Sequence, residues 1–155
     1  AGGSSHSDEY VEELKSMAGD RVIFTGYVYG DILHELYSNA YCYVHPSTIE
    51  GLPITLLEAV AYGKCVIGSN IPPVLEVVKD KGLIFESKNV DDLETKLKQA
   101  LSDPELTAKL GAEAKEMGIQ EYSYDNIAEK TEKLYRAVAA GESGLITGID
   151  DAVNN

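Results

Sequence analysis

Short apolar runs alternate along this chain with segments in which apolar residues recur every three or four positions. The runs are rich in β-branched and aromatic residues and end near Gly or Pro, which is typical of strands. The periodic segments are typical of helices with one buried face. Strands are predicted at Arg21–Gly26, Tyr41–Ser47, 64–68 and Gly82–Ser87, and helices at 10–17, Gly30–Ala40, 54–62, 72–80, 89–103, 103–118 and Tyr124–Ala140.

The order of these elements predicts the fold class. Strands that are apolar throughout and alternate with helices form parallel sheets whose two faces are both covered. Right-handed crossovers wind such a chain into a Rossmann-like layer. We therefore expect an α/β fold, with a Rossmann-like parallel sheet and helices on both faces, over residues 1–140, and a polar C-terminal tail at 141–155.

Side chains that can cap helices mark two of the predicted helix starts. Asp103 precedes Pro104, and Pro is favoured in a first helical turn because that turn leaves its N–H groups unpaired in any case. For the preceding helix, Asn89, Asp91 and Asp92 are all candidate N-caps. The pattern predicts a sharp break between two helices at Asp103.

The charge of the chain restricts which classes of molecule can bind to it. Its 155 residues carry 26 acidic against 13 basic side chains, for a formal net charge of −13. Such an excess repels the phosphates of nucleic acids and of anionic membranes, so we expect no nucleic-acid partner. A single nucleotide held by backbone N–H groups stays compatible with this charge, because those groups need no basic side chain.

The two cysteines, Cys42 and Cys65, each lie in an apolar, strand-like run. This placement favours buried free thiols over a metal or redox site, and free thiols suit a reducing cytoplasm. No stretch approaches the roughly 18–20 apolar residues of a membrane span. We therefore expect a cytoplasmic protein, and we expect neither a cofactor nor a metal ion.

The loop after the second predicted strand, HPSTIEGLPIT, carries the most informative chemistry. In open α/β sheets, ligands bind outside the carboxyl ends of the strands, where this loop lies. Gly51 lets a ligand approach the backbone, and Pro53 presets the backbone for the helix that follows. We expect the N–H groups of Ile54, Thr55 and Leu56 to point out of a helix N-terminus, which favours a phosphate or diphosphate.

Two acids flank this turn, and spacing alone leaves two interpretations of each. Glu50 would offer acceptors for sugar hydroxyls, and Glu58, one helical turn beyond Ile54, would reach a vicinal diol such as that of ribose. Alternatively, both carboxylates simply face water. His45, beside Pro46 at a strand end, either lines the same mouth or is a packed histidine with no role in binding.

The segment STIEGLPITLLEAVAYGKCVIGSN, from Ser47 to Asn70, resembles the donor-site motif of the retaining GT-B glycosyltransferases of family 4 (group 1). The flanking segments DRVIFTGYV, LYSNAYCYVHPS, LEVVKDKGLIF and DDLETKLKQALSDPEL also follow that family's order. The likeness covers roughly Tyr10 to Ala139. It implies the C-terminal, donor-binding half of a two-domain enzyme, cytoplasmic or peripheral to a membrane.

In such an enzyme a hexose or related sugar passes from a UDP- or GDP-linked donor to a saccharide or lipid-linked acceptor. The resemblance implies that transfer retains the sugar's configuration and uses no protein nucleophile. Glu50 matches the acid that meets the donor sugar at its reacting face and takes the catalytic position. The matching donor-binding positions are Tyr27 and Val28 for the nucleobase, Gly51, Leu52, Pro53, Ile54 and Thr55 for sugar and diphosphate, and Glu58 for the ribose.

The chain also departs from the family's pattern. The family's domain opens with a strand and a Gly-rich turn, and it brings an Arg and a Lys that neutralise the diphosphate. Here AGGSS is the only candidate remnant, and no Lys or Arg precedes Lys15. We therefore expect the first strand to be truncated or absent, the N-terminal acceptor domain to be missing, and this fragment to bind a donor without catalysing transfer alone.

Two other classes stay open on the sequence. One is a non-catalytic or excised α/β module that acts as an assembly or interaction unit and self-associates through an uncovered sheet edge. The other is a flavodoxin-like signalling domain, which would need a phosphoacceptor Asp at a strand end. No predicted strand ends in Asp.

Overall fold

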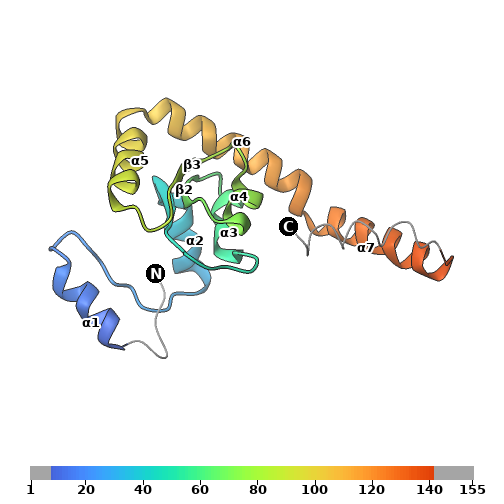
Figure 1. The fold of residues 1–155 in the computed structure, drawn as a ribbon, viewed down its shortest axis with the longest axis horizontal. Helices are drawn as coiled ribbons and strands as arrows, with labels where there is room; N and C mark the ends of the chain where they lie inside the picture. Colours follow the sequence, from blue (N-terminus) through green and yellow to red (C-terminus); the bar gives the residue numbers. More distant parts are fainter. Residues whose placement is uncertain (1–7, 142–155) are drawn as a thin grey trace. The chain divides into compact units, whose positions relative to one another are not determined.

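The computed structural model describes residues 8–141, and the chain divides into two units, Ala1–Ala40 and Tyr41–Asn155 (Figure 1). The position of one unit relative to the other is not defined. The AGGSS segment and residues 142–155, which make up nearly all of the expected tail, lie outside the described residues. No helix within the described range is long and apolar enough to cross a membrane.

The described part of the first unit contains two helices, α1 (Asp8–Met17) and α2 (Gly30–Asn39). The prediction of a strand at Arg21–Gly26 is wrong, because the structure has no strand there. The N–H of Val22 donates to the carbonyl of Gly19 in a turn, and no described strand pairs with the segment. A strand needs a neighbour for its N–H and C=O groups, so β-forming side chains alone do not make one.

The second unit contains a parallel sheet. Its strands β1 (Cys42–His45), β2 (Cys65–Ser69) and β3 (Leu83–Phe85) lie in the order β1-β2-β3. Between residues 41 and 141, five helices accompany the sheet: α3 (Ile54–Ala61), α4 (Pro72–Val78), α5 (Val90–Ser102), α6 (Pro104–Tyr122) and α7 (Tyr124–Ala139). The predicted α/β fold with a parallel sheet is confirmed.

The core lies on both faces of the central strand β2, all of whose residues are buried. Successive side chains of a strand point to opposite faces, so Val66 packs on one face and Cys65 and Ile67 on the other. The first face is covered by α3, α4 and α6, through Leu56, Val60, Val74, Val77, Val78 and Ala114. The second meets α5 and the start of α6, through Leu93, Leu97, Ala100 and Leu110. Helices therefore cover both faces, as predicted.

Both cysteines are free thiols, as the sequence predicted. Cys65 is buried in β2 and Cys42 is half-buried beside it in β1. Burial, together with a smaller effect of the neighbouring Cys42, raises the pKa of the Cys65 thiol to about 11. Cys65 is therefore a neutral packing residue at physiological pH.

The helix boundary at Asp103 is also as predicted. The Asp103 carboxylate accepts a hydrogen bond from the N–H of Leu106 at 2.9 Å, and α6 begins at Pro104. Of the three candidate caps for α5, Asn89 is the one that caps, through the N–H of Asp92 at 3.0 Å. From this boundary α6 runs across the sheet, and α7 continues away from it (Figure 1).

Replacing Asp103 with alanine is expected to lower the free energy of unfolding by about 1 kcal/mol, the usual effect of removing an N-cap. Chemical denaturation of the purified chain measures this change. Glu116→Ala is the matched control, because it removes an exposed carboxylate from the same helix. Equal effects of the two substitutions would contradict a capping role for Asp103.

Candidate functional site

The carboxylate of Glu50 is held by one of its two oxygens. Oε1 accepts a hydrogen bond from Ser47 Oγ at 2.7 Å and lies 3.0 Å from His45 Nε2. A carboxylate can only accept, so Nε2 carries the hydrogen in this contact. Among the described residues, Oε2 has no hydrogen-bond partner. The side chain of Glu50 is 26% exposed, against 8% for His45, so Oε2 is available to a ligand hydroxyl.

Tyr43 and Thr55 continue the polar contacts that Glu50 makes with His45. The hydroxyl of Tyr43 lies 3.4 Å from Nδ1 of His45, and a 3.0 Å hydrogen bond joins it to Oγ1 of Thr55. Tyr43 and His45 are two positions apart on β1, which places both rings on the same side of the strand, and they stack with centroids 5.9 Å apart. A continuous chain of polar contacts therefore joins the Glu50 loop to the first turn of α3.

Both acids of the motif act on the Tyr43 hydroxyl. Burial raises the pKa of Tyr43 above its ordinary value, the hydrogen bond to Thr55 lowers it, and the negative charges of Glu50 and Glu58 raise it. The net direction is upward, so Tyr43 keeps its proton at neutral pH. Glu50 and Glu58 thus both act on Tyr43 through their charge, and the binding of one ligand by both acids stays a prediction.

The start of the Glu50 loop is tied to the neighbouring strand. Ser69, the buried last residue of β2, donates from Oγ to the backbone carbonyl of Ser47 at 2.5 Å. Because β1 and β2 are parallel, this bond holds the loop at the carboxyl ends of both strands. Ligands of open α/β sheets bind at that edge.

The N-terminus of α3 differs in one respect from the expectation. The N–H groups of Leu56 and Leu57 both donate to the carbonyl of Pro53, at 3.0 and 3.1 Å. The expected availability of the Leu56 N–H is therefore wrong, because the first turn tightens onto Pro53. The exposed start of the helix is at Ile54 and Thr55. Gly51 is also exposed, and a Cβ built there would meet no atom within 4 Å.

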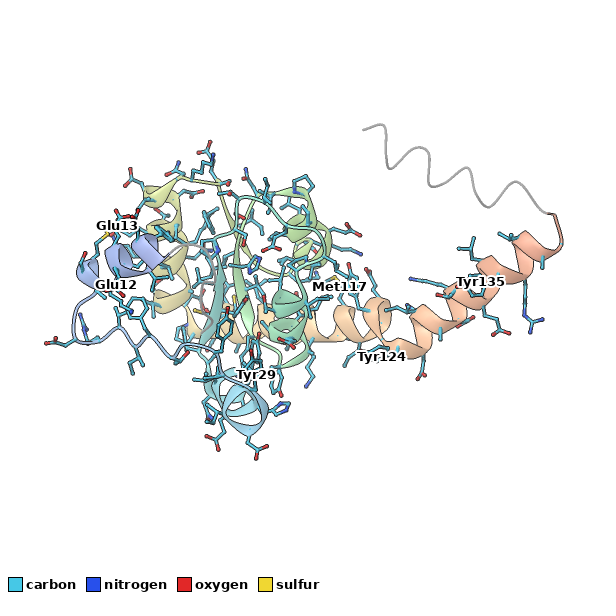
Figure 2. The ribbon with its side chains drawn as sticks, turned by 90° about the horizontal axis from the view of Figure 1, so that it is seen from below. Glu12, Glu13, Tyr29, Met117, Tyr124 and Tyr135 are labelled. Carbon is cyan, nitrogen blue, oxygen red and sulfur yellow. The ribbon has the colours of Figure 1, made fainter. Side chains whose placement is uncertain are left out.

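Glu58 lines a hollow of about 440 Å³ between α3 and the junction of α6 with α7. Among the described residues of the lining it is the only charged one, and most of the others are apolar: Leu52, Ile54, Leu57, Val60, Ala61, Ile119, Tyr122, Tyr124 and Ile127. Figure 2 shows Tyr124 where α7 begins. Glu58 is half-buried at this wall, so it is not a fully solvated surface acid.

Tyr27 and Val28 belong to the first unit, and the position of that unit relative to the Glu50 loop is not defined. The ring of Tyr27 is exposed and stacks on that of Tyr29 at a centroid distance of 6.4 Å. Their expected contact with a nucleobase stays a prediction.

Sequence reasoning missed Tyr43, Ser47 and Ser69 as site residues. The signal for Tyr43 was present, because a residue two positions before His45 on a strand must share its side. Ser69 had no such signal, since its bond to the Ser47 carbonyl depends on the pairing of β1 with β2.

Comparison with known proteins identifies the family of this chain. The family model for group 1 glycosyl transferases matches residues 1–117. An uncharacterized glycosyltransferase of Methanocaldococcus jannaschii is 35% identical over 138 residues, which cover 86% of this chain and 35% of that protein. The O-antigen chain mannosyltransferase B of Escherichia coli is 33% identical over 117 residues, covering 73% of this chain and 29% of the relative. The chain thus spans about a third of the length of these relatives.

Solved structures show the same fold. Sucrose-phosphate synthase of Thermosynechococcus elongatus matches with a TM-score of 0.76 and 28% identity, over 86% of this chain and 34% of that one. Anabaena HepE in complex with UDP and glucose matches with a TM-score of 0.77 and 20% identity, over 84% of this chain and 37% of that one. From the family match and these relatives, the chain belongs to the group 1 glycosyltransferases.

Proposed function

We propose that this chain is the donor-binding part of a retaining glycosyltransferase and that it holds a nucleoside-diphosphate sugar, linked to UDP or GDP, along the Glu50–Glu58 loop. The sugar would be a hexose or a related sugar, and the acceptor a saccharide or a lipid-linked saccharide. One matching protein, Anabaena HepE, is described in two solved structures, with UDP and glucose and with UDP-glucose bound, which supports a ligand of this chemical class.

The observation that carries the proposal is the state of Glu50. One carboxylate oxygen receives two protein contacts, from Ser47 and His45, and the other has no partner among the described residues. A carboxylate that only balanced charge or faced water would not need this one-sided anchoring. The arrangement presents a fixed acceptor, which suits a sugar hydroxyl and gives Glu50 its proposed place at the reacting face.

The direction of the loop suggests where the diphosphate, the ribose and the nucleobase of the donor would bind. The diphosphate would meet the backbone of Gly51 and Leu52 and the start of α3, beyond Pro53, where the positive end of the helix dipole lies at Ile54 and Thr55. The ribose would meet Glu58, one turn further along the same helix. Tyr27 and Val28 would contact the nucleobase.

Breaking the bond between sugar and phosphate leaves a diphosphate, whose charge must be stabilised in the transition state. Residues 45–58 contain no Lys or Arg. We therefore expect this chain to bind its donor without transferring the sugar, because the stabilising charges and the acceptor site must come from outside this loop. Transfer belongs to the whole enzyme, of which an acceptor-binding domain would be the partner.

Titration with UDP, GDP and ADP tests the proposal. We expect UDP or GDP to shift the backbone NMR signals of residues 50–58 more than ADP does, while the signals of α5, which packs on the other face of the sheet, stay in place. If none of the three nucleotides moves the loop signals at millimolar concentration, donor binding by this chain is wrong.

The exposed edge of β1 supports a second candidate function, an assembly module that pairs with another copy of itself. Among the described residues β1 pairs only with β2, and Val44 on β1 is exposed. An unpaired strand edge is a template for a further strand. Sedimentation would show a dimer that Val44→Lys shifts to monomer, and a strictly monomeric chain at high concentration would exclude this candidate.

A further inference from the structure

We propose that His45 is a positioning residue that fixes the Glu50 carboxylate for the donor sugar, with Tyr43 and Thr55 fixing His45 in turn. The proposal rests on the proposed function of Glu50 as the acceptor of a sugar hydroxyl. It assigns a role to a buried histidine that the sequence left open between the ligand mouth and simple packing.

The orientation of the Glu50 carboxylate depends on a hydrogen-bond donor that cannot move. The contacts from Ser47 and from His45 Nε2 converge on Oε1, so turning the carboxylate would break both. A serine hydroxyl rotates freely and would follow a moving carboxylate. The His45 side chain is only 8% exposed and cannot follow it. His45 therefore sets the orientation in which Oε2 is presented to the ligand.

The His45 ring is itself held in place on its other side. Its Nδ1 lies 3.4 Å from the Tyr43 hydroxyl, which Thr55 holds by a 3.0 Å hydrogen bond, and the two rings stack. Thr55 lies in the first turn of α3, next to the proposed diphosphate. The chain Glu50–His45–Tyr43–Thr55 thus connects the sugar end of the proposed site with its diphosphate end, and it lets binding at one end order the other.

A packed histidine without a positioning role makes a different prediction at its nitrogens. If His45 positions Glu50, Nε2 carries a hydrogen at neutral pH, because the carboxylate oxygen 3.0 Å away can only accept. Nitrogen-15 NMR of the ligand-free chain reads this directly, and His45→Gln identifies the signal among the three histidines. A signal for an Nε2 without hydrogen would overturn the proposal.

Ligand binding supplies the second readout. Affinities for UDP and UDP-glucose, and for GDP and GDP-mannose, are measured on the wild type, His45→Phe and His45→Gln. His45→Phe keeps a stacked ring but removes both nitrogens, so we expect the gain in affinity from the linked sugar to fall roughly tenfold while binding of the free nucleotide is unchanged. His45→Gln keeps a nitrogen donor near the Nε2 position and should restore most of the gain.

Tyr43→Phe tests the outer part of the chain, and Tyr41→Phe is its matched control because the Tyr41 hydroxyl bonds to the Ala100 carbonyl elsewhere. We expect a smaller loss of sugar-dependent affinity for Tyr43→Phe and none for Tyr41→Phe. The proposal would be overturned if the His45→Phe variant folds and its affinity still rises as much as that of the wild type when the sugar is linked to the nucleotide. If no nucleotide or nucleotide sugar binds the wild type, the proposed function fails, and the nitrogen signals alone then decide whether His45 anchors Glu50.

Discussion

Replacing Gly111 with alanine is expected to lower the free energy of unfolding by about 3 kcal/mol, at the upper end of the usual cost of overpacking. Gly111 is buried in α6 where that helix crosses the turn before β2. A Cβ at this position would collide with the backbone carbonyl oxygen of Gly63 and come within 3.0 Å of the Cys65 N–H nitrogen. Backbone atoms cannot rotate away as a side chain can, so the helix itself would have to move.

Urea denaturation measures this loss, with Gly19→Ala as the control because a Cβ at Gly19 meets no atom within 4 Å. The result also matters for the site, since α6 forms one wall of the hollow that Glu58 lines. A change below about 1 kcal/mol for Gly111→Ala would contradict the close seating of α6 on this turn.

Replacing Glu58 with alanine is expected to weaken binding of UDP or GDP about ten- to hundredfold, with little change in the free energy of unfolding. The estimate follows from the loss of hydrogen bonds between a carboxylate and ribose hydroxyls, each worth about 1.5–3 kcal/mol before desolvation. The fold should tolerate the change because Glu58 lines an open hollow and lies outside the buried core.

The ribose itself provides the control for this substitution. If Glu58 binds the two hydroxyls, a 2′,3′-dideoxy nucleotide should bind the wild type weakly, and Glu58→Ala should cost it almost nothing. Asp91→Ala, which removes an acid from α5, should leave the affinity for both nucleotides unchanged. An equal loss for the ribose and the dideoxy nucleotide would show that Glu58 acts through general charge and has no specific contact with the diol.

Much of the second unit could be predicted from the sequence because its helices are marked by residues that lie close together in the chain. Hydrophobic periodicity locates α3 to α7, and the cap at Asp103 depends on residues three positions apart. The strand predicted at Arg21–Gly26 failed because a strand depends on a pairing partner that its own residues do not encode.

In the candidate site, too, features that depend on neighbouring residues could be predicted, and features that depend on distant residues could not. The two acids and the Gly-Leu-Pro turn lie within nine residues of one another, so the sequence could single them out as candidates. The hollow beside Glu58 could not, because Tyr122 and Tyr124 reach it from a helix junction more than sixty positions away. The use of the Leu56 N–H by Pro53 was missed because the tightness of a first helical turn is a matter of local geometry.

A comparison of two ligands tests the central claim most directly. Backbone NMR shifts of the wild-type chain saturated with a nucleoside diphosphate are subtracted from those with the same nucleotide carrying a hexose. The account predicts that the nucleotide shifts the signals of Ile54 to Glu58 in both cases, and that the hexose-dependent difference concentrates on His45, Ser47 and Glu50. A difference that falls outside residues 45–52, or the absence of any shift in residues 45–58 at saturation, would contradict it.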